Sequence, residues 1–136
     1  MQEPISIIAQ IVEWTDLKCH IQAASEPTFY FKEREIWWAS IGANLGSEQN
    51  GKHDLFERPV LVLKKFGPHM LWILPMTTSQ KETPYHFRTA FHDKEKQQSA
   101  DLSQIRTISA RRLIRKQRVL PIDEFTEIRR RLREWL

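Results

Sequence analysis

Residues 34–65 constrain the fold more than any other part of this chain, because they combine two strand patterns with a polar loop between them. Residues 35–41 are rich in Trp and Ile, as expected for a half-buried strand. Residues 60–63 form an uninterrupted apolar run bounded by Pro59 and Lys64, which is typical of a core strand. The segment therefore predicts two strands of a small sheet.

The loop between these strands ends beside an arginine. Gly46, Asn50 and Gly51 permit tight turns with positive φ. Pro59 cannot donate a hydrogen bond to a sheet, so it belongs at the first residue of a strand or on an edge. Arg58 is then placed at the mouth of the loop, where the strand meets solvent. A guanidinium on a rigid strand beside a polar loop predicts an anion site.

Length and composition are those of one globular domain. The chain has 136 residues, of which 40% are hydrophobic and 28% are charged, so we expect a single core rather than disorder. It has no apolar run long enough to span a membrane, and its N-terminus, with Glu3, lacks the pattern of a signal peptide. Cys19 is its only cysteine, which excludes an intrachain disulfide. We therefore expect a cytoplasmic protein.

Positive charge gathers at the C-terminal end of the sequence. Residues 106–136 hold ten Lys or Arg against four Asp or Glu, whereas residues 1–105 hold eleven against thirteen. This asymmetry favours a polyanionic partner, either RNA or an acidic protein segment. The arginines within residues 129–133 are better explained as the solvated face of a surface helix. The two interpretations are evenly balanced for three other arginines: Arg106, Arg111 and Arg112.

Short strands dominate the middle of the chain. Turn signals and runs of strand-forming residues predict five strands and a sixth after them: 35–41, 59–64, 70–75, 85–90, 104–108 and 114–119. Residues 109–113 are expected to form a short helical turn. Pro121 opens a closing helix whose apolar residues recur every three or four positions. These are Ile122, Phe125, Ile128, Leu132 and Leu136.

The first 31 residues are predicted to form an N-terminal helical extension. Apolar residues recur with partly helical spacing over residues 5–21, and Ser25-Glu26-Pro27 ends the pattern. A break into two pieces is expected at Thr15-Asp16. Trp14 is expected to pack this segment onto the body of the protein rather than to bind a base. The elements together predict a mainly β, α+β fold, in which a small curled sheet carries a helix at each end.

Five sequence blocks resemble the PemK/MazF family of toxin ribonucleases. Residues 34–37 read Arg-Glu-Ile-Trp, residues 46–51 read Gly-Ser-Glu-Gln-Asn-Gly, and residues 58–63 read Arg-Pro-Val-Leu-Val-Leu. Leu-Pro-Met-Thr-Thr at 74–78 and Leu-Ser-Gln-Ile-Arg-Thr-Ile at 102–108 follow in the family's order. The similarity covers about residues 32–136. It implies one domain, 1–136, built on the SH3-like barrel of the PemK/MazF/CcdB type.

The resemblance also implies an activity. Members of the family cleave single-stranded RNA at short sequences, using the substrate's own 2′-hydroxyl as nucleophile and leaving a 2′,3′-cyclic phosphate. They need no metal and no cofactor, act as homodimers, and are blocked by the acidic, disordered segment of an antitoxin. Carried over by position, Arg58 and Thr77 are the catalytic residues. The candidates for RNA binding are Glu48, Gln49, Thr78, Gln80, Gln104 and Arg106.

Three serines depart from the family pattern. Some relatives have a histidine at the position of Ser47, an acidic residue at the position of Ser103, and an Asp at the position of Ser109. The mechanism must then depend on Arg58 and Thr77. Glu48 either contributes a carboxylate near the phosphate or, slightly favoured, caps the loop by accepting hydrogen bonds from its backbone amides.

Two rival functions remain open on these residues. A barrel with a degenerate site could hold nucleic acid or a protein without cleaving it. A relative of CcdB could instead bind gyrase, although the Arg58 and Thr77 match argues against this. The five histidines show no metal-ligand spacing. His53 and His86 could each approach RNA, but neither lies in a motif.

Overall fold

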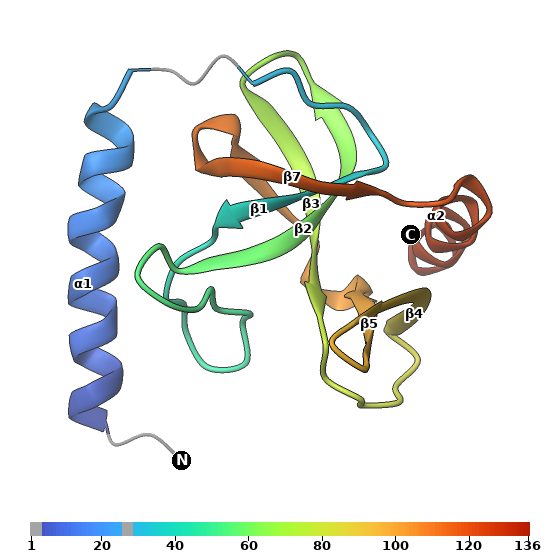
Figure 1. Cartoon of the computed structure of the whole chain (residues 1–136). Coiled ribbons are helices and arrows are strands. Elements are labelled where there is room, and N and C mark those ends of the chain that lie inside the picture. The colour runs from blue at the N-terminus through green and yellow to red at the C-terminus, as the bar shows by residue number, and fades with distance from the viewer. Residues whose placement is uncertain (1–3, 26–28) are drawn as a thin grey trace.

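The computed structural model describes residues 4–25 and 29–136 and shows a curled antiparallel sheet with helices at both ends of the chain (Figure 1). Two 3₁₀ turns, η1 and η2, interrupt the strands near the C-terminal end. The elements in chain order are α1 (Pro4–Ala23), β1 (Glu35–Ser40), β2 (Glu57–Phe66), β3 (Met70–Thr77), β4 (His86–Asp93), β5 (Lys96–Asp101), η1 (Leu102–Gln104), β6 (Arg106–Ser109), η2 (Ala110–Arg112), β7 (Leu113–Val119) and α2 (Ile122–Trp135).

Strand β3 pairs with three other strands and so determines how the sheet curls. The strand order is β4-β5-β3-β2-β1-β7, and β6 also pairs with β3. The first half of β3 pairs with β6, from Met70 to Ile73, whereas its end pairs with β5 at Met76 and Thr77. One strand thus has two successive partners on the same edge. This exchange curls the sheet into a half-barrel, and Thr77 lies just after the exchange.

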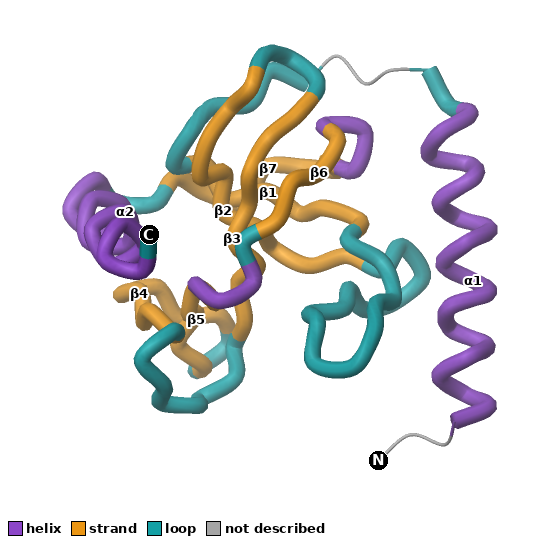
Figure 2. Tube along the Cα trace, turned by 180° about the vertical axis from the view of Figure 1, so that it is seen from behind, coloured by secondary structure: helices purple, strands orange, loops and turns teal. Residues whose placement is uncertain are grey.

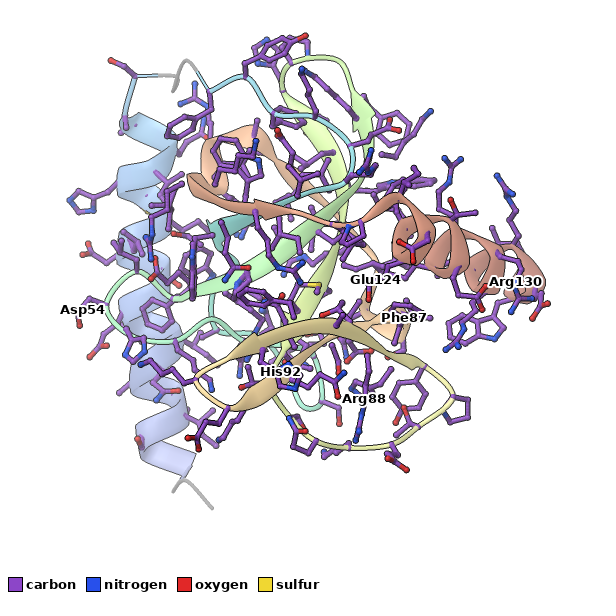
Figure 3. All side chains as sticks on the ribbon, turned by 45° about the vertical axis from the view of Figure 1, so that its right-hand side comes forward. Asp54, Phe87, Arg88, His92, Glu124 and Arg130 are labelled. Atoms are coloured by element: carbon purple, nitrogen blue, oxygen red, sulfur yellow. The ribbon has the colours of Figure 1, made fainter. Side chains whose placement is uncertain are left out.

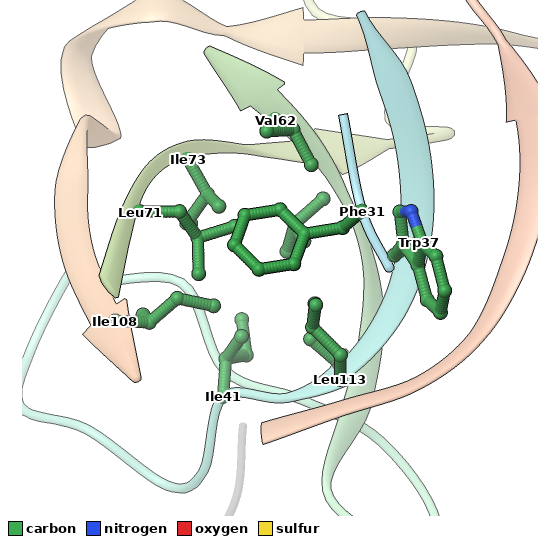
Figure 4. Packing of buried hydrophobic residues seen from close by; sticks show 10 residues of the cluster. Phe31, Trp37, Ile41, Val62, Leu71, Ile73, Ile108 and Leu113 are labelled. Carbon is green, nitrogen blue, oxygen red and sulfur yellow. The ribbon is translucent and has the colours of Figure 1, made fainter. Parts of the chain in front are cut away.

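The sheet is buried on both faces, and successive residues of one strand serve different cores. In β2, Val60 and Val62 belong to one apolar cluster, while Leu61 and Leu63 belong to the other. This alternation follows from the two-residue repeat of a strand, and burial of both faces explains why residues 60–63 read as a continuous apolar run. Figure 4 shows the first cluster, in which Phe31 fills the space between the curled strands.

Helix α2 closes the second cluster and contacts the outer hairpin. Phe125 and Ile128 are buried in that cluster. The Glu124 carboxylate accepts a hydrogen bond of 2.8 Å from the backbone N–H of Ala90 in β4. Figure 3 shows Glu124 on the side of α2 that faces Phe87 of the same strand. The predicted amphipathic closing helix is therefore confirmed, and it holds the β4–β5 hairpin against the barrel.

Three local expectations were wrong. Helix α1 continues through Thr15-Asp16, where the Thr15 hydroxyl donates to the Ile11 carbonyl four residues earlier and leaves the backbone helical. The strand expected at 104–108 begins only at Arg106, because η1 occupies the preceding residues. Strand β5 was not expected at all.

The last two errors fall on neighbouring segments, the β4–β5 hairpin and the η1 turn that follows it. Asp101 ends β5 and caps η1, accepting a hydrogen bond from the backbone N–H of Ser103. The turn before β5 places Lys94 and Glu95 at φ values of 49° and 71°. Such turns usually contain Gly or Asn, so the sequence carries no signal for this hairpin.

Helix α1 runs along one side of the half-barrel, beside the long loop between β1 and β2 (Figure 2). Trp14 is its buried contact, with 6% of its surface exposed, as expected for a packing residue. No helix within the described residues is long and apolar enough to cross a membrane.

Candidate active site

Arg58 is fixed between the loop and the end of β3. Its Nε donates to the Asn50 carbonyl at 2.7 Å, and its Nη1 donates to the Met76 carbonyl at 3.2 Å. A guanidinium has five N–H donors, so these two bonds leave three for a ligand. Burial lowers the pKa of Arg58 and the nearby Asp101 carboxylate partly offsets this effect. The group stays cationic at neutral pH, because the pKa of arginine lies far above 7.

Thr77 lies across the sheet from Arg58. Val60 of β2 pairs with Pro75 of β3; Arg58 precedes Val60 by two residues and Thr77 follows Pro75 by two. In an antiparallel ladder these offsets place the two side chains opposite each other on the same face. The Thr77 hydroxyl oxygen accepts a hydrogen bond of 3.1 Å from the Ser79 N–H.

One cavity of about 260 Å³ brings these two residues together. Its lining comes from β1, β2, β3, β5 and the tip of the β1–β2 loop. The residues are Trp38, Lys52, His53, Glu57, Arg58, Pro59, Met76, Thr77, Thr78 and Gln98. Thr78, predicted to bind RNA, therefore lies beside the proposed catalytic pair.

A second, smaller cavity gathers four of the predicted RNA-binding residues. It has a volume of about 180 Å³ and shares no lining residue with the first cavity. Its lining residues are Asn44, Glu48, Gln49, Pro75, Gln104 and Arg106. Gln80 lines neither of these two cavities; its side-chain amide donates to the Thr78 carbonyl at 2.7 Å.

The polar residues of the second cavity bind the loop as well as line the space. The Gln49 backbone N–H donates to the Gln104 side-chain oxygen at 3.2 Å, and the Gln104 amide donates to the Ser47 carbonyl at 3.0 Å. The Glu48 carboxylate accepts a bond of 2.8 Å from the Leu45 N–H. Glu48 thus caps its own loop, and it lines the cavity of Gln49 rather than that of Arg58 and Thr77.

Asp101 is a site residue that the sequence analysis missed. Only 3% of its surface is exposed. One carboxylate oxygen accepts bonds from the Ser103 N–H at 3.1 Å and the Ser103 hydroxyl at 2.6 Å; the other accepts from the Gln49 amide at 3.2 Å. His86 Nε2 lies 3.7 Å from the second oxygen. Asp is a common cap of a helical turn, but no local signal marks the contacts of Asp101 with Gln49 and His86.

Position 103, which is acidic in some relatives, is a serine here, and it donates to the carboxylate of Asp101. Asp101 connects the loop, the η1 turn and His86, and its negative charge faces Arg58. His86 is buried against this carboxylate, with 6% of its side chain exposed. It does not line the Arg58 cavity, unlike His53.

Three arginines in this part of the molecule are desolvated. Burial lowers the pKa of Arg106, and the nearby Glu48 carboxylate partly offsets it. Burial also lowers the pKa of Arg112, and the charge of Arg106 lowers it further. With Arg58, these groups concentrate positive charge around the loop, which favours an anionic ligand.

The C-terminal arginines do not join this cluster. Arg130 and Arg131 pair with Glu127 on the same helix, with N–O distances of 2.8 and 3.1 Å. Figure 3 shows Arg130 on α2, across the molecule from Asp54 of the β1–β2 loop. The interpretation as a solvated helix face is confirmed for Arg130, whereas Arg131 is half-buried, with its guanidinium carbon 5.0 Å from the centroid of the Phe87 ring.

Comparison with known proteins decides the family. Residues 32–136 match the model of the PemK-like, MazF-like toxins of type II toxin–antitoxin systems. This chain belongs to that family. The match contains Arg58, Thr77 and both cavities, and it excludes α1. No curated protein sequence matches the chain.

Solved structures agree with the fold of this toxin. MazF from Deinococcus radiodurans superposes with a TM-score of 0.61 at 18% identity, covering 79% of this chain and 96% of that one. A mycobacterial endoribonuclease bound to its cognate antitoxin gives 0.59 at 11% identity, with 77% and 93% covered. The Mycobacterium tuberculosis toxin MazF-mt6 gives 0.57 at 16% identity, with 74% and 94% covered.

His53 supplies the toxin with an imidazole at a position that no motif marks. It follows Lys52, whose backbone N–H and carbonyl both pair with Glu57 at 2.9 and 3.0 Å. This closes a turn in which His53 adopts a φ of 66°, a conformation for which His is enriched. The turn presents His53 to the cavity of Arg58 and Thr77, whereas Ser47 lies at the position where some relatives have histidine.

Proposed function

We propose that this toxin is an endoribonuclease that cuts single-stranded RNA at a short sequence, without a metal ion, until an antitoxin neutralises it. The observation that carries the proposal is the cavity shared by Arg58 and Thr77. It combines a cation that matches two phosphate oxygens with a hydroxyl on a stiff β-branched side chain. These are the groups that stabilisation of a phosphorane requires.

In the proposed reaction the 2′-oxygen forms a bond to the adjacent phosphorus while the bond from phosphorus to the 5′-oxygen breaks. The products are a 2′,3′-cyclic phosphate and a 5′-hydroxyl. One proton leaves the 2′-hydroxyl and one reaches the 5′-oxygen. Negative charge builds up on the non-bridging oxygens between these events, where the Arg58 donors stabilise it.

Thr77 and His53 have separate parts in this scheme. The Thr77 oxygen already accepts from the Ser79 N–H, so its hydroxyl proton is available to a phosphate oxygen. Proton transfer needs a group that changes charge near neutral pH, and histidine is the side chain suited to this. We assign the transfer to His53, which lines the same cavity.

The proposed partners follow the charge and the exposed apolar surface. The desolvated arginines favour RNA and, in competition with it, an acidic antitoxin segment. A homodimer is expected because Trp72, Ile105 and Leu136 are exposed along an apolar cavity between α2 and the sheet. The mass of the purified protein in solution tests this, and a monomer at micromolar concentration contradicts it.

The decisive experiment uses labelled RNA with EDTA present. We expect cleavage to persist, with a cyclic phosphate at the 3′ end of the upstream fragment. Once the cut site is mapped, an RNA with hydrogen in place of the single 2′-hydroxyl at that site serves as control. It should bind but remain uncut, since its phosphates and bases are intact but the nucleophile is gone.

Other outcomes identify a different function. Equal cutting of the deoxy-substituted RNA, or a strict requirement for added magnesium, favours a metal-dependent nuclease. Binding of RNA without any cutting indicates a barrel with a degenerate site. If the protein neither binds nor cuts RNA, a protein target such as gyrase is favoured.

A further inference from the structure

Helix α1 lies outside the segment that defines the family, yet it packs against the β1–β2 loop, which borders the site. The family match begins at residue 32, and α1 ends at Ala23. Ile7 and Ile11 of α1 line a cavity of about 320 Å³ together with Asn44, Gly46 and other residues of the β1–β2 loop. Helix α1 and the β1–β2 loop therefore lie side by side around this cavity.

Trp14 is the contact of α1 at the base of this loop. Its indole covers Gly42, where φ is +92° and where any Cβ would overlap the indole ring. Its ring also meets the Phe56 ring, with centroids 5.8 Å apart. Gly42 and Phe56 lie at opposite ends of the loop, so one side chain holds both ends. Arg112 covers the indole, with its guanidinium carbon 5.4 Å from the ring centroid.

Hydrogen bonds connect this base to Arg58. The Phe56 carbonyl accepts from the N–H groups of Ile41 at 3.0 Å and Gly42 at 3.3 Å. The Gly42 carbonyl in turn accepts from the Gly51 N–H at 2.8 Å. The residue before Gly51 is Asn50, whose carbonyl receives the Arg58 Nε. Gly42 is thereby connected to the guanidinium through two hydrogen bonds and the peptide bond between Asn50 and Gly51.

We propose that Trp14 is a positioning residue for the active site: it clamps the base of the β1–β2 loop and so sets the place of Arg58. The expected effect of Trp14 on turnover rests on the proposed RNA cleavage at the Arg58 site. The clamp on the loop does not depend on that function. A displacement of about 1 Å in a reacting group costs up to about 10²-fold in rate. Removal of the clamp should therefore lower turnover without removing any group that touches RNA.

The structural test is amide hydrogen exchange on the full chain. In Trp14→Ala, the protection of the Gly42 and Gly51 amides should fall by about tenfold or more, while the amide of Val62 in the core of β2 keeps its protection. Trp14→Phe, which keeps an aromatic ring, should give a smaller loss. Val12→Ala is the matched control on the same helix, since Val12 is 63% exposed.

The kinetic test separates positioning from general instability. Trp14→Ala should slow single-turnover cleavage by about tenfold, while the Kd for the uncleavable deoxy-substituted RNA changes by less than about threefold. In a protein that already carries Arg58→Ala, Trp14→Ala should lower the cleavage rate little further, because both substitutions act through the Arg58 guanidinium. Val12→Ala should cleave as the parent does.

Several results overturn the proposal. Unchanged exchange at Gly42 and Gly51 shows that Trp14 does not hold the loop. Independent losses in the double variant, or a fall in the fraction of active molecules at an unchanged rate constant, show that Trp14 only stabilises the fold. If the parent protein does not cut RNA at all, the proposed function fails, and the exchange experiment still decides whether the clamp exists.

Discussion

Replacement of Arg58 by alanine should affect the rate of RNA cleavage far more than the stability of the fold. Arg58 makes two hydrogen bonds to backbone carbonyls, at 2.7 Å to Asn50 and 3.2 Å to Met76. A hydrogen bond from a charged donor contributes about 1.5–3 kcal/mol when it is well buried. Because Arg58 is only half-buried, water replaces part of both bonds in the variant. We expect the free energy of unfolding to fall by about 1–2 kcal/mol, more than the roughly 0.5 kcal/mol typical of a surface substitution.

The effect on cleavage should be larger than the effect on stability. Loss of a preorganised donor to a developing charge costs about 10²–10³ in rate, or about 2.7–4 kcal/mol. Arg58→Lys should restore only part of this, since an ammonium cannot contact both carbonyls and two phosphate oxygens at once. Arg130→Ala is the control: it removes the same charge from α2, where Arg130 pairs with Glu127 and Glu134.

Single-turnover cleavage and urea denaturation measure the two effects separately, and a sulfur-substituted RNA assigns the contact. Replacement of a non-bridging oxygen at the scissile phosphate by sulfur should slow the parent. It should slow Arg58→Ala much less, because the contact it disturbs is already absent. Near-native cleavage by Arg58→Ala, or an undiminished effect of sulfur in that variant, would refute the role of Arg58.

Two further substitutions test the other cavity residues. Thr77→Ala should lower turnover more than Thr77→Ser, which keeps the hydroxyl and loses only the methyl group that stiffens the rotamer; equal rates of RNA cleavage would make Thr77 a packing residue. His53→Gln should slow cleavage by about 10²-fold or more, because proton transfer by a positioned side chain contributes about 10²–10⁴. Near-parental cleavage by His53→Gln would assign proton transfer to another group.

The strands that carry the site could be predicted because their signals are local. Residues 60–63 are a continuous apolar run, and Pro59 marks where the strand meets the loop. Both features survive in β2, whose apolar residues face two cores. The position of Arg58 beside the loop could be predicted from Pro59 alone, because this proline marks the start of the strand.

Strand β5 could not be predicted, because tertiary contacts determine it. Its residues Gln98, Ser99 and Asp101 are polar and yet 1–3% exposed. They are buried by pairing with β3 and β4 and by partners far away in the sequence. Gln98, for example, accepts a bond of 2.6 Å from Arg118. The role of Asp101 was hidden for the same reason, since its partner Gln49 lies 52 residues away.

Trp14 was expected to pack α1 onto the body of the protein, but the rest of the packing face of this helix could not be predicted from the sequence pattern. Apolar residues occur on all sides of this helix, and Ile8 and Val12 are 60% and 63% exposed. Periodicity therefore does not distinguish the inner face from the outer one. Trp14 fits here because Gly42 has no side chain. The sequence does not show which residue will cover a glycine in a loop.

The arrangement around Arg58 explains how a site without the family's histidine and acid at positions 47 and 103 can still be preorganised. Asp101 holds Gln49, and the Gln49 N–H binds Gln104, so the loop is fixed by its own polar residues. The same loop gives Arg58 a backbone carbonyl on one side, and β3 gives it a second on the other. The guanidinium thus loses its rotamer freedom on folding, before any ligand binds, so that this loss would not weaken the proposed interaction with a transition state. The same residues therefore hold the loop in place and form the proposed site. Stability must be measured together with activity for every variant at this site.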